Sequence, residues 1–206
     1  MEIRDEIALH TGDILLFKGT SIVSHLLEWL GVSKYSHVGI VLKNPKFLNP
    51  DLEDGIYVLE STMYNEAADA ENNQHKMGVQ IHHIDDILAS STPGSVFVRQ
   101  VHCARNEEFY KNFNKIHETI HNKPYDLNWY DWICAKYNIS CELPEDARFK
   151  STSHFWCSAL VAYVLCELGL IEKDINWSLM APREFSSQEG KYIKFICKVN
   201  DEKNIY

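Results

Sequence analysis

The stretch FWCSALVAYVLCEL at residues 155–168 carries the strongest helix signal in the chain and is the best guide to its fold. Ser151, Thr152 and Ser153 lie just upstream and belong to the residue types that cap helix N-termini. Cys157 then falls in or just past the first turn, where free N–H groups and the helix dipole stabilise a thiolate. Cys157 is therefore a candidate nucleophile, although on position alone a small buried core residue is the more common case.

The faces of this helix indicate where the Cys157 thiol points. At about 100° per residue, one group of residues shares the face of Cys157 and a second group lies away from it. We therefore predict that the thiol points inward, onto a sheet. The shared face contains Leu160, Val161, Val164 and Leu168, and the residues directed away are Ala159, Tyr163, Cys166 and Glu167.

A predicted β-hairpin with a long loop supplies the second group of candidate residues. Residues 37–42 and 56–61 are rich in β-forming types, and the loop between them contains several Pro, Asn, Asp and Gly turn signals. A loop of this length does not fix the register of the two strands. The pairing must therefore be assumed before side chains can be compared across the hairpin.

We assume that Val41 pairs with Ile56. This register places His37 directly opposite Glu60, with Cβ atoms about 4.5–5.5 Å apart. The carboxylate can then orient the imidazole, and Gly39 leaves room beside the ring. A lone His–Glu pair is more often a surface contact than a catalytic one, so this pair gains meaning only in combination with Cys157.

The remaining segments complete a mixed α and β pattern without an internal repeat or a linker. Residues 63–83 lose their periodicity and are interpreted as a surface excursion of a single domain that spans residues 1–206. The aromatic residues Trp129, Tyr130 and Trp132 are interpreted as core in preference to a substrate groove. The other predicted elements are strands at 12–17, 95–101 and 192–199 and helices at 21–30 and 106–121, the second helix capped by Asn106.

Composition limits the classes of function. A length of 206 residues predicts one domain, and a hydrophobic content of 45% is enough for an ordered core. The 20 Lys and Arg against 29 Asp and Glu give a net charge of −9, which argues against nucleic-acid partners. The longest apolar run, Phe155 to Cys166, is too short for a membrane span. The sequence leaves the oligomeric state open.

The cysteines and histidines outside the candidate site predict no cofactor and no metal. The six cysteines form no CxxC pair, and residues 1–7 contain acidic side chains where a signal peptide is basic and then apolar. We therefore expect a reducing, cytoplasmic location, with most cysteines buried and inert. His75, His82 and His83 are interpreted as solvated loop residues, because adjacent histidines in an extended segment point to opposite faces.

Six short motifs between about Thr11 and Val199 carry a resemblance to a known family. They are Gly12-Asp13-Ile14, Tyr35-Ser36-His37-Val38-Gly39-Ile40-Val41, Leu59-Glu60, Gly78-Val79, Pro124-Tyr125-Asp126 and Trp156-Cys157-Ser158-Ala159-Leu160-Val161. Together they resemble the permuted papain-like amidases of the YaeF/YiiX type, which have poxvirus relatives and lie near the NlpC-type peptidases and lecithin retinol acyltransferase. The departure from the family pattern is that Trp156 and Ala159 stand where a tyrosine and a glutamate are common.

This resemblance implies a fold and a set of roles. The implied fold is α+β and circularly permuted papain-like, with a mostly antiparallel sheet or small barrel packed against helices and the nucleophile at a helix N-terminus. Cys157 is the implied nucleophile, His37 the general base and later acid, and Glu60 the group that holds the imidazole. Without the resemblance, the same three residues are already the parts of a Cys-His-acid thiol hydrolase.

The predicted reaction is hydrolysis of an amide or ester bond through an acyl-enzyme on Cys157, with a small-molecule, peptide or acyl-amide substrate. Two alternatives stay open: an acyltransferase or lipid-remodelling enzyme that uses the same acyl-enzyme, and a binding module that does not turn over. The Cys157 backbone N–H is the firmest donor to an oxyanion. Tyr35 and Trp156 are further candidates for an oxyanion or substrate contact, although Tyr35 is more simply explained by packing.

Overall fold

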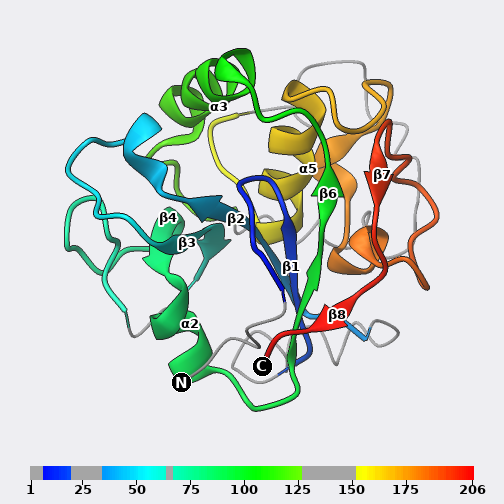
Figure 1. Ribbon diagram of the computed structural model, residues 1–206, viewed down its shortest axis with the longest axis horizontal. Helices are drawn as coiled ribbons and strands as arrows, with labels where there is room; N and C mark the ends of the chain where they lie inside the picture. The colour runs from blue at the N-terminus through cyan, green and yellow to red at the C-terminus, as the bar shows by residue number, and fades with distance from the viewer. Residues whose placement is uncertain (1–6, 20–33, 64–66, 127–151) are drawn as a thin grey trace.

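A six-stranded antiparallel sheet forms the centre of the structure (Figure 1). The structure is a computed structural model that describes residues 7–19, 34–63, 67–126 and 152–206. In the order of the sheet, the strands are β4 (Gly78–His83), β3 (Ile56–Thr62), β2 (His37–Lys43), β1 (Ile14–Phe17), β5 (Val96–Arg99) and β8 (Lys203–Asn204). A separate pair joins β6 (Val101–His102) to β7 (Lys198–Val199).

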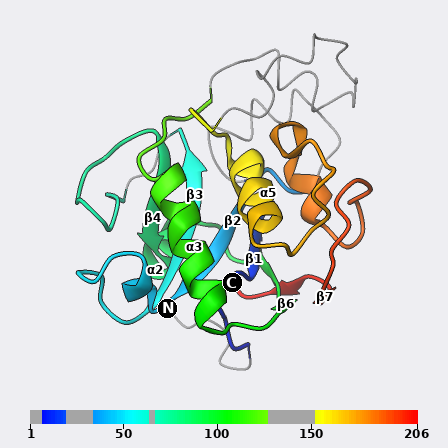
Figure 2. The same ribbon diagram turned by 90° about the horizontal axis from the view of Figure 1, so that it is seen from above.

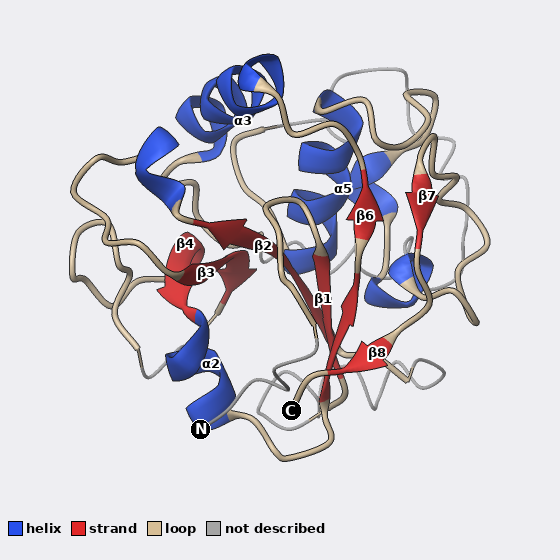
Figure 3. Cartoon of the chain, viewed as in Figure 1, coloured by secondary structure: helices blue, strands red, loops and turns tan. Residues whose placement is uncertain are grey.

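The described helices pack on both sides of this sheet. In Figure 3, α3 (Glu107–Ile120) and α5 (Cys157–Glu167) lie above the strands, and α2 (Ile84–Ser90) lies below them. Figure 2 shows α3 and α5 side by side, and the two helices contact each other. Three short 3₁₀ helices, η1 (Pro45–Phe47), η2 (Trp177–Leu179) and η3 (Pro182–Phe185), complete the described elements.

Alternation along the strands divides the core into two apolar clusters. On β2, Val38 and Ile40 pack with the cluster that includes α3 and α5, whereas Val41 packs with the cluster that includes α2. Both groups are buried because the sheet is covered on each face, and this explains why the strand reads as a continuous apolar run. The prediction of an antiparallel sheet packed against helices is confirmed. The strands close into no barrel among the described residues, since β4 and β8 are the two ends of the sheet.

Most predicted elements occur close to their expected bounds. The predicted strands at 37–42 and 56–61 are β2 and β3, and the helices predicted at 106–121 and 155–168 are α3 and α5. Asn106 caps α3 as expected, because its side chain accepts a hydrogen bond from the Phe109 N–H at 3.0 Å. The helix predicted at 21–30 and the aromatic patch at 129–132 lie outside the described residues.

Two predicted segments differ from the structure. Residues 78–83 are not part of a surface excursion but form β4, and polar Gln80 and His82 are buried within it, which hid the strand period from the sequence. The strand predicted at 192–199 is short, because only Lys198–Val199 is a strand in this stretch and Phe195 makes an isolated bridge to Ile171.

The assumed hairpin register is wrong by two residues, since Val41 pairs with Val58. The loop explains the shift. The Asn44 N–H donates to the Gly55 carbonyl at 2.8 Å, and the Gly55 N–H donates to the Asn44 side chain at 2.9 Å, so these two residues close the loop. A two-residue shift keeps every side chain on its original face, because the strand period is two.

Gly78, which begins β4, meets another segment at close range. Its φ is +114°, and a Cβ added to it would lie 2.2 Å from the Lys123 carbonyl oxygen. The next N–H, that of Val79, donates to the same carbonyl at 2.8 Å. The Gly78-Val79 motif is therefore needed for the contact between β4 and the segment that enters the Pro124-Tyr125-Asp126 motif.

We expect Gly78→Ala to destabilise the protein by about 3 kcal/mol or more, since the substitution combines an unfavourable φ with a backbone clash. Gly94→Ala is a matched control, because Gly94 also has a positive φ, of +85°, but has open space around it. It should cost about 1 kcal/mol. Urea unfolding of both variants checks this, and equal losses would contradict the close contact.

Candidate active site

His37 and Glu60 form a close pair at the centre of the candidate site. The His37 Nε2 atom lies 2.5 Å from the Glu60 Oε2 atom. The His37 side chain keeps 19% of its surface exposed, whereas that of Glu60 keeps 3%. Because the register is shifted, the two residues are diagonal neighbours on β2 and β3 instead of direct partners. Both remain on one face of the hairpin, and their predicted contact is present.

A third residue, His82, contacts the second oxygen of the Glu60 carboxylate. The His82 Nδ1 atom lies 2.9 Å from the Glu60 Oε1 atom, and the His82 ring is fully buried. The interpretation of His82 as a solvated loop residue is thus wrong, since β4 carries it into the sheet beside β3. Of the other two histidines in that interpretation, His75 is exposed and His83 is half-buried, its side chain capping α2.

The two rings control the charge of the buried carboxylate. Burial alone would raise the pKa of Glu60, yet the charge and hydrogen bond of His37, with those of His82, hold this pKa well below its ordinary value. Glu60 is therefore a carboxylate at neutral pH. A buried carboxylate needs such partners, because leaving one unpaired costs several kcal/mol.

Cys157 is the first residue of α5, as predicted, and it is buried. The predicted caps do not contribute to this helix start. The N-cap is Trp156, without a side-chain capping bond, and Thr152 and Ser153 precede it by four and three residues. Ser151, the third predicted cap, lies outside the described residues.

Other contacts hold the start of α5 in place. The Ser61 hydroxyl of β3 donates to the Phe155 carbonyl at 2.6 Å, and the Ser158 hydroxyl donates to the Met180 carbonyl at 2.6 Å. Ala159 and Cys166, which are predicted to point away from the sheet, are also buried. The helix is therefore covered on more than one face. The position of Cys157 is thus set by the sheet on one side and by the chain after η2 on the other.

The structure brings Cys157 and His37 together. Burial by itself would lower the pKa of His37, but the charge and hydrogen bond of Cys157, with those of Glu60, raise it from 6.5 to about 10. The bond to Glu60 uses Nε2, which leaves Nδ1 for the sulfur. A protonated ring between a sulfur and a carboxylate is the arrangement that an activated thiolate requires.

Two predicted accessory residues have other contacts. Burial and the carboxylates of Glu202 and Glu189 raise the pKa of Tyr35 to about 12, and its ring packs edge-on against Phe97. The Trp156 indole N–H donates to the Met180 carbonyl at 3.3 Å. Neither observation places these side chains at the Cys157 sulfur, so their contact with an oxyanion or substrate stays a prediction.

Tyr125 is a neighbour of Cys157 that the sequence analysis did not assign to the site. Its side chain is buried, and burial followed by the charge of Cys157 raises the pKa of Tyr125 well above its ordinary value. The phenol therefore keeps its proton at neutral pH and can donate a hydrogen bond. The signal for it was its place in the Pro124-Tyr125-Asp126 motif, which had been interpreted only as a turn.

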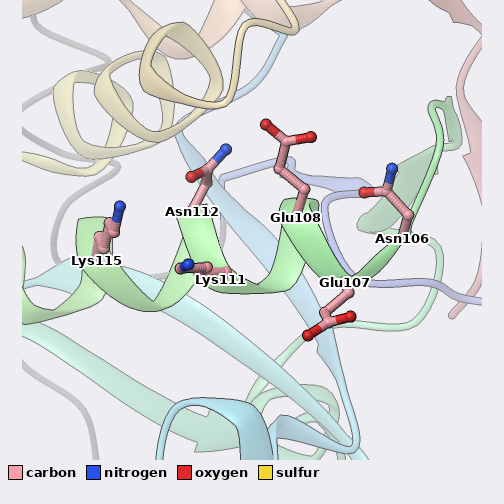
Figure 4. Close-up of a pocket in the computed structure, with 6 residues that line it drawn as sticks. All are labelled: Asn106, Glu107, Glu108, Lys111, Asn112 and Lys115. Atoms are coloured by element: carbon pink, nitrogen blue, oxygen red, sulfur yellow. The ribbon is translucent and has the colours of Figure 1, made fainter.

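Two further features lie on α3. A surface pocket lies along the first turns of α3 (Figure 4). Its lining residues are polar or charged, and none of them is a cysteine or a histidine. At the other end of the helix, Glu71, His117 and His121 offer ligand atoms within 4.8 Å of one another, although the sequence analysis expected no metal. The pocket is lined by Asn106, Glu107, Glu108, Lys111, Asn112 and Lys115.

The fold and site define a mixed α/β protein in which a cysteine, a histidine and a glutamate meet at a helix N-terminus. No family model and no curated protein matches the chain. Among solved structures, the chain is similar to the crystal structure of the metalloprotein yiiX from Escherichia coli O157:H7. The TM-score is 0.52 at 15% identity, over 95% of this chain and 98% of the other. The two proteins thus share a fold at a coarse level.

None of the helices in the described part of the chain has the length and apolar character needed to cross a bilayer.

We expect Cys157→Ala to lower the pKa of His37, because it removes the strongest influence that raises this pKa and leaves burial, which lowers it. NMR titration of labelled histidine side chains measures the change. Cys166→Ala is the matched control, since Cys166 is a buried thiol on the same helix and should leave His37 unchanged. An unaltered His37 pKa in Cys157→Ala would show that the two groups do not interact.

Proposed function

We propose that the protein is a thiol hydrolase that cleaves an amide or ester bond through an acyl-enzyme on Cys157. The observation that carries the proposal is the geometry of the site: His37 lies 2.5 Å from the buried Glu60 carboxylate and also bonds Cys157, the first residue of α5, and these contacts raise the pKa of His37 to about 10. A ring that stays protonated at neutral pH can pair with a thiolate and then act as a proton donor. The YiiX-like fold is compatible with this chemistry and does not test it.

In the first half of the proposed reaction, the Cys157 sulfur attacks the substrate carbonyl carbon and forms a C–S bond. The carbonyl oxygen becomes an oxyanion, which the backbone N–H of Cys157 can bind at the helix start. His37 then gives its proton to the leaving amine or alcohol as the C–N or C–O bond breaks. A thioester on Cys157 and a neutral imidazole remain.

In the second half, neutral His37 takes a proton from water, which attacks the thioester carbonyl. The C–S bond breaks, the acid product leaves, and the proton on His37 restores the starting pair. Glu60 takes no proton in this sequence. Its buried carboxylate orients the ring through Nε2 and stabilises the charge that the ring carries at the start and end of the cycle.

We expect an iodoacetamide probe at neutral pH to label Cys157 faster than Cys103, although Cys157 is the more buried thiol. The reason is that burial raises the pKa of Cys103, whereas Cys157 faces a protonated imidazole. Peptide mass spectrometry gives both rates in one sample. His37→Asn should slow the labelling of Cys157 roughly 10-fold or more and leave Cys103 unaffected.

Labelling of Cys157 no faster than that of Cys103 would argue against a thiol enzyme and for a binding module. A covalent adduct on Cys157 after incubation with cell extract would identify the acyl group. Product masses with and without an added amine then separate hydrolysis from acyl transfer, because transfer requires the acceptor in the product.

Tyr125 is proposed as a second donor to the oxyanion. We expect Tyr125→Phe to lower the Cys157-dependent hydrolysis of p-nitrophenyl acetate by roughly 10-fold or more, in the lower range for loss of one oxyanion donor. Iodoacetamide labelling of the same variant should keep its rate, because alkylation forms no oxyanion. Parallel losses in both assays would instead mean that Tyr125 supports the thiolate or the fold.

A further inference from the structure

A second cluster of chemistry-bearing side chains lies at the C-terminal end of α3. Glu71 comes from the loop before β4, and His117 and His121 lie one turn apart on α3 and its C-cap. The Glu71 Oε2 atom lies 3.3 Å from His117 Nε2 and 3.1 Å from His121 Nδ1. Glu71 and His117 are almost fully buried, whereas the His121 side chain is 37% exposed.

From this cluster we propose a binding site for a divalent transition-metal cation, with Zn²⁺ as the best fit, held by Glu71, His117 and His121. This inference is independent of the thiol chemistry proposed for Cys157. Two imidazoles and one carboxylate are an established zinc ligand set, and they leave a fourth position for water or another ligand.

The spacing of the three ligand atoms supports this assignment. Tetrahedral zinc with bonds of about 2.0–2.1 Å places neighbouring ligand atoms roughly 3.3 Å apart. Both distances from the Glu71 oxygen to the histidine nitrogens fall close to this value. A cation could thus be bound with small movements of the three side chains.

The sequence contains an independent signal for the same site. Residues 117–121 read HETIH, a match to the pattern His-Glu-x-x-His, in which two histidines share one helix face and bind zinc. A pattern this short often occurs by chance. It supports a metal site here because the Glu71 carboxylate lies close to both histidines. The apolar stripe of residues 106–121 predicts an amphipathic helix but does not by itself reveal this pair of ligands.

The surroundings suit a cation. The site lies at the C-terminal end of α3, where the helix dipole favours positive charge. On the other side of the ring, the Asn122 side-chain nitrogen donates a hydrogen bond to His121 Nε2, and this bond has to change when Nδ1 binds a cation, because a metal-bound histidine carries its proton on the other ring nitrogen. Lys76 also contacts Asn122, and its charge is balanced by an ion pair with Asp69.

The site is proposed to bind a metal ion, without a catalytic role for the glutamate of the pattern. Glu118, the second residue of the pattern, is exposed and accepts a hydrogen bond from Asn114 one turn earlier at 3.3 Å. It is therefore not assigned a role as a base. The effect expected of the ion is to fasten the loop that carries Glu71 to the end of α3.

Equilibrium dialysis of the EDTA-treated full chain against Zn²⁺ tests the site, with bound zinc measured by mass spectrometry and stability by thermal unfolding. We expect one bound equivalent and a higher unfolding temperature. His121→Ala and Glu71→Gln should each weaken binding roughly 10-fold or more. His75→Ala, an exposed histidine in the same loop, should bind as the parent does.

Cys157→Ala separates this site from the thiol site. Zinc binding that survives Cys157→Ala and is lost in His121→Ala supports the proposal. Binding lost in Cys157→Ala, or a thiolate-to-metal charge-transfer band with Co²⁺, would assign the ion to the thiol site and overturn it. Absence of a bound equivalent in the parent chain would overturn it as well. Glu71→Gln decides the matter if His121→Ala fails to fold.

Discussion

The buried Glu60 carboxylate joins three neighbouring strands of the sheet to the candidate active site. It lies on the middle strand of three, and its two oxygens meet a histidine from each neighbour, His37 on β2 and His82 on β4. Removing one partner from a buried ionic pair costs about 3–5 kcal/mol, a large part of the stability of a domain. A change that separates these strands would therefore also disrupt the geometry of the site.

The same strand also fixes the nucleophile. Glu60 and Ser61 are adjacent on β3, so their side chains point to opposite faces of the sheet. Glu60 orients His37, and the Ser61 hydroxyl holds the Phe155 carbonyl two residues before Cys157. One dipeptide thus positions the base on one face and the start of α5 on the other. Direct packing of α5 against β2 completes the arrangement and brings together two residues that lie 120 positions apart in the sequence.

The sequence predicted the main elements and the His37–Glu60 contact because these depend on periodicity. A two-residue error in register left the contact intact, since it preserves the face. The predictions were wrong where polar side chains are buried and where contacts with distant residues replace local helix caps. Gln80 and His82 masked β4, and contacts from Ser61 and Ser158 hold α5 where local caps were expected. The roles of the three residues are still predictions.

The segment after α3 links the two clusters of side chains. His121 caps α3, and Tyr125, four residues later, lies beside Cys157. Between them, the Lys123 carbonyl accepts from Val79, and the Pro124 carbonyl accepts from the Phe155 N–H at 3.0 Å. An ion at the proposed site would fix the first residue of this segment and so influence Tyr125.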